Sequence, residues 1–197
     1  IEGISDKITL SVSDSTEIEI DVLGVGDDKI STKLEENTGG LVAKNMFTEN
    51  RIDGGIKIEI EKGVPPGKGL GSSAATASAV AFGINEIYQL GLSSSQLLSF
   101  AASGEIASAG VPHADNVAGS IFGGFTVVHY SSNYSIQTFS PPENLRICLA
   151  IPDIETPDKK TGKARDVIPE QIPFVDVVKN IANASMMVAG FAKQDMS

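Results

Sequence analysis

The sequence has no tryptophan, contains one cysteine (Cys148) and is short of positive charge, and the last two shortages make some classes of protein unlikely. A single cysteine forms no internal disulfide, which is typical of a reducing compartment, so we expect a cytoplasmic protein. No apolar run approaches the roughly 18 residues needed to span a membrane, so we expect no membrane partner. The formal net charge of −10 repels phosphate backbones, so we expect no nucleic-acid partner.

Charged residues are also scarce in the middle of the chain. Between residues 64 and 142 the sequence has charge only at Lys68, Glu86, Glu105 and Asp115, and most of its glycine, alanine and serine lies there. Such a stretch is mostly buried or contains a site, and a buried charge is costly unless it is paired or bound to something. These four residues are therefore the first candidates for function.

What the sequence does contain is ordinary for a globular protein: 197 residues, of which 41% are apolar, are enough for a sizeable core. Alternating polar and apolar residues predict strands, and apolar runs bounded by capping residues or glycine predict helices. We expect an α+β fold with an antiparallel sheet and packed helices. The predicted strands are 7–12, 17–22, 56–61, 125–130, 135–139 and 145–151, and the predicted helices are 38–50, 72–90, 93–105, 117–122 and 174–192.

The strongest chemical signal is a glycine-rich loop that leads directly into a helix, Pro65-Pro66-Gly67-Lys68-Gly69-Leu70-Gly71-Ser72-Ser73-Ala74. Glycine lets the backbone approach a ligand closely, and a helix N-terminus presents N–H groups and a partial positive charge that suit phosphate. Ser72 and Ser73 add hydroxyls for phosphate oxygens or a magnesium ion. The glycine content alone leaves a flexible linker before an alanine-rich core helix as an equal alternative.

Two familiar phosphate-binding patterns fit this loop poorly. The Walker A pattern fails because Lys68 is followed by Gly69 rather than by serine or threonine. Residues 69–74 do fit the dinucleotide pattern G-x-G-x-x-A. The strand before that pattern should be apolar on both faces, whereas residues 56–61 alternate, so we disfavour a dinucleotide-binding fold.

A second group of candidates is Glu105, His113, Asp115 and Asn116. Magnesium is often held by a few carboxylate or hydroxyl oxygens together with substrate phosphates, so one glutamate and one loop serine would suffice. The alternatives are structural. Glu105 would be a partly exposed carboxylate near a helix end, and Asp115 or Asn116 would cap the predicted helix 117–122.

Three segments carry a family resemblance. Residues 65–74 match every fixed position of P-x-x-x-G-L-G-S-S-A, the phosphate loop of the GHMP kinases, a superfamily that includes galactokinase, homoserine kinase and mevalonate kinase. Residues 104–118 resemble the G-E-x-x-x-S/A-G-x-x-H-A-D-N-V-A stretch of the homoserine kinase family, and I-F-G-G-F follows at 121–125. Residues 163–169 resemble that family's x-A-R-x-x-L/I-P segment.

The resemblance implies a reaction and a site. It implies the fold of the second domain of ribosomal protein S5, ATP and L-homoserine as ligands, Mg²⁺ as the metal and a homodimer for the complete protein. Its runner-up readings are another GHMP kinase, for shikimate or mevalonate, and a non-catalytic ligand sensor. The implied ATP-binding residues are Asn37, near the adenine, and Pro65, Lys68, Gly69, Leu70, Gly71, Ser72, Ser73 and Ala74. The implied metal ligands are Ser73 and Glu105, which together with Asn116 form the implied catalytic set. The implied substrate-binding residues are His113, Asp115, Asn116 and Arg165.

The resemblance also predicts the domain organisation. Residues 1–152 would be the ATP-binding domain, and residues 153–197 a linker and the start of a second α/β domain. We expect both ends of the chain to be cut, because it begins at Ile1 without a methionine and stops at Met196-Ser197 in a segment that reads as a helix. The wide apolar surface of that helix would lack its cover, so we expect this chain alone to bind substrate poorly and to associate.

Overall fold

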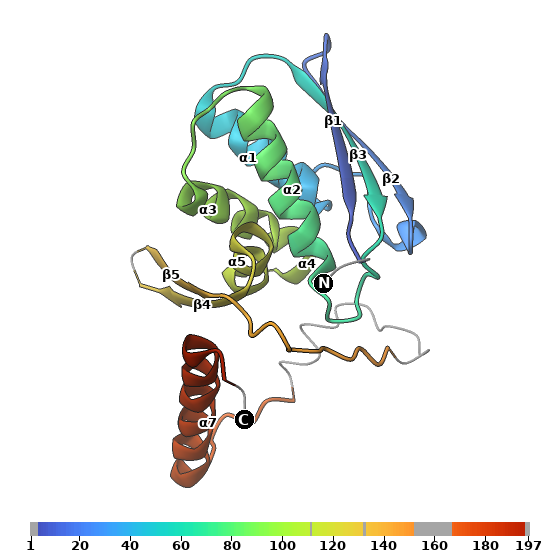
Figure 1. Cartoon of the computed structure of the whole chain (residues 1–197). Coiled ribbons are helices and arrows are strands. Elements are labelled where there is room, and N and C mark those ends of the chain that lie inside the picture. Colours follow the sequence, from blue (N-terminus) through green and yellow to red (C-terminus); the bar gives the residue numbers. More distant parts are fainter. Residues whose placement is uncertain (1–3, 111, 132, 152–166, 196–197) are drawn as a thin grey trace.

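The computed structural model describes residues 4–110, 112–131, 133–151 and 167–195 (Figure 1). Its first part is a three-stranded sheet in the order β1-β3-β2, packed against helices α1 and α2. The predicted α+β class is therefore confirmed. These elements are β1 (Lys7–Ser13), β2 (Ile18–Gly24), the short 3-10 helix η1 (Asp27–Lys29), α1 (Thr38–Asn50), β3 (Gly55–Lys62) and α2 (Ser72–Ile87).

The sheet is mixed rather than antiparallel. β1 runs antiparallel to β3, with Leu10 opposite Ile58, as predicted. β2 runs parallel to β3, with Ile20 opposite Ile58, so the antiparallel prediction is wrong for this pair. The physical reason is the connection: α1 lies between the two strands, and such a crossover returns the chain to the end from which it started.

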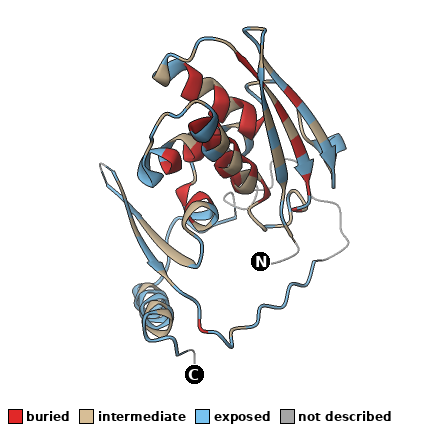
Figure 2. Ribbon diagram, turned by 45° about the horizontal axis from the view of Figure 1, so that its top comes forward, coloured by how far each residue is buried: buried red, intermediate tan, exposed pale blue. Residues whose placement is uncertain are grey.

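One face of β3 forms the centre of the core. Ile56, Ile58 and Ile60 are essentially fully buried, and they face the helices, whereas Lys57 and Glu59 lie on the outer face in ion-pairing distance of each other. α2 packs closely because its inner side is made of small residues such as Ala74 and Ala77. Figure 2 shows the buried residues concentrated in α1, α2 and the inner side of the sheet.

A second group of helices continues the core beneath α2. The capping box predicted at the start of α3 is confirmed, because Ser93 accepts from the Gln96 amide and the Gln96 side chain accepts from the Ser93 amide. Helix α5 begins at Ala114 rather than at Val117, so neither Asp115 nor Asn116 caps it. The elements are α3 (Ser94–Gly104), α4 (Ile106–Ala109), α5 (Ala114–Phe122) and the hairpin of β4 (Phe125–Tyr130) and β5 (Tyr134–Phe139).

The C-terminal part departs further from expectation. Residues 145–151 are not a strand, because no described strand pairs with them. Helix α7 (Phe174–Lys193) has no buried residue, and its Phe174 is 80% exposed, so the uncovered apolar surface is confirmed. α7 contacts β4 through Phe191, whose ring stacks on Phe125 with centroids 4.0 Å apart. The predicted domain boundary at 152–153 adjoins residues outside the described ranges, and it stays a prediction.

None of the helices in the described ranges has both the length and the hydropathy that crossing a membrane requires.

Candidate active site

The glycine-rich loop joins β3 to α2 and has the backbone that its glycines predict. Gly67, Gly69 and Gly71 have φ angles of 72°, 75° and 71°, which lie in the left-handed region where a side chain is strained. Gly71 is also the N-cap residue of α2, and it brings no side chain to cap the helix. The positive end of α2 therefore opens directly onto the loop, an arrangement that suits a phosphate group.

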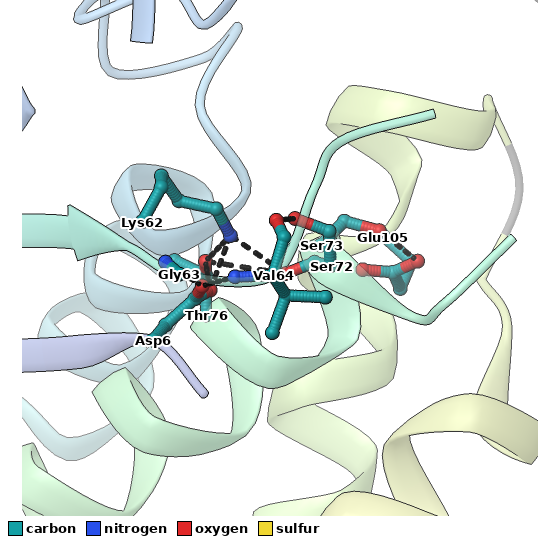
Figure 3. Close-up of polar contacts among 8 residues, drawn as sticks. All are labelled: Asp6, Lys62, Gly63, Val64, Ser72, Ser73, Thr76 and Glu105. Atoms are coloured by element: carbon teal, nitrogen blue, oxygen red, sulfur yellow. Dashed lines mark hydrogen bonds and ion pairs between the residues drawn. The ribbon is translucent and has the colours of Figure 1, made fainter. Parts of the chain in front are cut away.

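The two serines that follow Gly71 point in different directions (Figure 3). The Ser72 hydroxyl is buried and donates to the Val64 carbonyl at 2.8 Å, so it closes the loop from inside. The Ser73 hydroxyl donates to Oε2 of Glu105 at 2.9 Å. The structure therefore brings together the two residues predicted as metal ligands, although they are 32 positions apart in the sequence.

Glu105 lies between α3 and α4 and is only 4% exposed, so the reading of it as a partly exposed carboxylate is wrong. Burial raises the pKa of its carboxyl group; the Ser73 hydrogen bond and the nearby Lys62 charge lower the pKa, and the Asp115 charge raises it. Its second oxygen, Oε1, is buried and accepts no hydrogen bond from the described residues. An unpartnered buried carboxylate oxygen is costly, and a cation would satisfy it.

These residues fit a magnesium ion. The described residues contain no group of three His, Cys, Asp or Glu side chains that could hold a metal without help. One carboxylate and one hydroxyl are nevertheless typical of a magnesium site completed by water and by phosphate oxygens. Glu105 and Ser73 supply that pair at the N-terminus of α2.

α5 brings the predicted substrate residues to the same place. A Cβ atom on Gly71 would lie 3.7 Å from Cβ of Asn116, so Asn116 stands over the first turn of α2. Asp115 is exposed, and its charge acts on the Glu105 carboxyl group. His113 is half-buried at the start of α5. Asn116 therefore lies beside the glycine-rich loop, and Asp115 lies near enough to Glu105 to act on its carboxyl group.

One predicted residue has a structural role of its own. Asn37 is 2% exposed and caps α1: its Oδ1 accepts from the Gly40 amide and its Nδ2 donates to the Ser31 carbonyl. This explains its burial without a ligand, and a contact with adenine stays a prediction. Arg165 lies outside the described residues.

The sequence reasoning missed three residues behind the loop. Asp6, Lys62 and Thr76 form a buried polar cluster that touches both ends of the loop. A signal for Lys62 was present: it continues the even-numbered series of β3, whose other members are buried isoleucines. A lysine on a buried face needs a partner, and the pattern alone does not reveal which acid supplies it.

The fold and the site define a class of protein: an α+β domain with a glycine-rich loop at a helix N-terminus, beside one buried carboxylate. Residues 35–124 match the family model described as the GHMP kinases N terminal domain. This part of the chain therefore corresponds to the N-terminal domain of the GHMP kinases.

The chain is similar over nearly its whole length to homoserine kinases of known sequence. It is 40% identical to that of Methanococcus vannielii over 97% of this chain and 62% of the relative, and 40% identical to that of Methanocella arvoryzae over 99% and 60%. The crystal structure of homoserine kinase from Cytophaga hutchinsonii superposes with a TM-score of 0.84 at 31% identity, over 96% of this chain and 59% of that one. The chain thus spans about three fifths of the length of these proteins.

More distant solved structures show the fold alone. The L. major mevalonate kinase superposes with a TM-score of 0.55 at 18% identity, over 71% of this chain and 43% of that one.

Proposed function

We propose that the protein containing this chain is a homoserine kinase. It transfers the γ-phosphoryl group of ATP to the side-chain hydroxyl of L-homoserine, giving O-phospho-L-homoserine for threonine biosynthesis. The observation that carries this proposal is the Ser73–Glu105 hydrogen bond at the start of α2, with the second Glu105 oxygen buried and unpartnered. The similarity to homoserine kinases at about 40% identity supports the choice of substrate within the GHMP kinases.

The glycine-rich loop binds the triphosphate of ATP. Its three glycines allow the backbone between Pro65 and Ala74 to follow the phosphate chain closely, and the N-terminus of α2 contributes its partial positive charge. Lys68 is half-buried in the same loop and offsets part of the phosphate charge. Asn37 meets the adenine in this proposal.

Ser73 and Glu105 hold Mg²⁺ together with phosphate oxygens. When bound, the ion neutralises charge that develops on the transferred phosphoryl group. Glu105 suits this role because burial disfavours a carboxylate that has no partner. A bound cation would compensate the buried negative charge. Ser73 keeps the carboxylate in place through its hydrogen bond to Oε2.

The α5 residues bind the acceptor. Asn116 lies beside Gly71 and orients the attacking hydroxyl, with His113 and Asp115 lining the substrate site. An amide cannot take up the proton, but phosphoryl transfer depends chiefly on positioning and charge stabilisation, so a strong base is not essential. Arg165 pairs with the substrate carboxylate, which matches the planar fork of its guanidinium.

A phosphoacceptor screen tests the proposal. The full-length protein is incubated with Mg-ATP and, separately, with L-homoserine, shikimate or mevalonate, and products are identified by ³¹P NMR. We expect phosphorylation of homoserine alone. Turnover of another acceptor, or ATP binding without any turnover, would refute the substrate assignment in favour of another GHMP kinase or a ligand sensor.

The same proposal includes two properties of the whole protein. We infer a homodimer, which sedimentation of the full-length protein tests. We also infer that it works in the cytoplasm, where ATP is available to it; fractionation of cells tests this.

A further inference from the structure

A buried ion pair lies directly behind the glycine-rich loop (Figure 3). Asp6 precedes β1 and Lys62 ends β3, and their side chains are 1% and 2% exposed. Removing two charges from water is expensive, and apolar residues of similar size are often at least as stabilising. A contribution to the stability of the fold therefore does not by itself explain the Asp6–Lys62 ion pair, and its contacts indicate another role.

The contacts of the pair reach both ends of the loop. At the entry, Oδ1 of Asp6 accepts from the amides of Gly63 and Val64 at 3.1 and 3.0 Å. At the exit, Nζ of Lys62 donates to the carbonyl of Ser72, the first residue of α2, at 3.0 Å. The pair thus ties the end of β3 to the first turn of α2 across the intervening loop.

Thr76 completes the cluster one turn into α2. Its hydroxyl accepts from Lys62 at 2.9 Å and donates to Oδ2 of Asp6 at 3.0 Å. Lys62 therefore uses its three N–H donors on Asp6, Ser72 and Thr76. It has none left for a phosphate, which separates its role from that of Lys68.

We propose that Asp6 and Lys62 are positioning residues that fix the two ends of the glycine-rich loop and thereby determine its affinity for the triphosphate of a nucleotide. This inference rests on the proposed function only in naming ATP as the ligand. A loop held in its binding geometry before the ligand arrives loses less conformational entropy on binding. The pair is neutral as a whole, so its effect on affinity comes from geometry rather than from net charge.

The test measures ATP binding by calorimetry and steady-state kinetics in the full-length protein. Lys62→Met removes the tie to Ser72, and Asp6→Leu with Lys62→Met removes both ties without leaving a buried unpaired charge. The matched control is Lys57→Met on the same strand, because the ion pairs of Lys57 with described residues are those with Asp21 and Glu59, away from the glycine-rich loop. We expect the dissociation constant and KM for ATP to rise about 10-fold to 100-fold in both variants. We expect KM for homoserine to change less than 2-fold in these variants, and the ATP constants of the control variant to change less than 2-fold.

Thermal melts separate positioning from folding. The single variant leaves the Asp6 carboxylate buried without its partner, so it melts lower, whereas the double variant recovers much of that loss. We expect no matching recovery of ATP affinity in the double variant. If Lys62→Met does not fold, Lys62→Arg keeps the charge but presents a planar fork in place of a tetrahedral set of donors, and it should weaken ATP binding on its own.

The outcomes are distinguishable from those of the proposed function. ATP affinity within 2-fold of the parent protein in the folded variants overturns the inference, as does an affinity that follows the melting temperature. Weakened ATP binding in a protein that does not phosphorylate homoserine supports the inference and refutes the proposed acceptor.

Discussion

Replacing Glu105 by glutamine should stabilise the metal-free protein while it removes the proposed activity. The carboxylate is almost fully buried, its Oε1 has no partner among the described residues, and burial raises its pKa. Glutamine keeps the shape and the Ser73 contact but removes the charge. The glutamine NH2 group takes the place of Oε1 and is also without a partner, so the gain comes from removing the buried charge. We expect this gain to be about 1 kcal/mol, which corresponds to about 2–4 °C in Tm for a protein of this size.

The pH dependence gives the sign of the effect. A carboxyl group whose pKa is higher in the folded state binds its proton more tightly when folded, so its stabilising contribution is complete below the unfolded-state pKa and disappears as pH rises through the folded-state pKa. The Tm difference between Glu105→Gln and the parent protein should therefore be smallest in acid and should widen through that window.

The assays are differential scanning calorimetry without divalent cations and turnover with Mg-ATP. We expect kcat to fall at least about 100-fold, the size typical of losing one charge-stabilising group, and Mg²⁺ to lose its effect on nucleotide binding. The control is Glu86→Gln, an exposed carboxylate at the end of α2. A lower Tm for Glu105→Gln without metal, or unchanged turnover, would refute the assignment of Glu105 as a metal ligand.

Three further changes test the loop, the α1 cap and the α7 surface. Gly71→Ala forces a side chain into the left-handed region, which costs about 1–2 kcal/mol and should weaken ATP binding by calorimetry; intact affinity would contradict the loop assignment. Asn37→Ala removes the α1 cap and should lower the free energy of unfolding in urea by about 1–2 kcal/mol, unlike the exposed Asn116→Ala. Val178→Lys with Ile181→Lys should reduce association of this chain in sedimentation velocity, and unchanged association would show that α7 is not the contact.

The sequence could predict the residues whose chemistry is local. The glycine spacing and the helix after it specify the loop, and the charge-poor surroundings single out Glu105 before any contact is known. The Ser73–Glu105 pairing itself followed from the family resemblance, and the structure places the two side chains 2.9 Å apart.

Long-range pairing could not be predicted in the same way. Alternation tells which face of residues 18–24 is buried but not whether the strand runs parallel or antiparallel to β3, since both directions use the same period. Residues 145–151 are mostly apolar, as in a buried strand, and still form no strand, because a strand needs a neighbour for its backbone. Asp6 and Lys62 meet across 56 positions, which no local pattern records.

The stack of Phe191 on Phe125 gives this molecule a place for an optical reporter. The rings are parallel within 2°, and they join α7 to the β4–β5 hairpin. Because the sequence has no tryptophan, Phe191→Trp would introduce the single indole of this chain. A change in the fluorescence of this indole would then report the separation of α7 from β4, because no other tryptophan in this chain emits in that wavelength range.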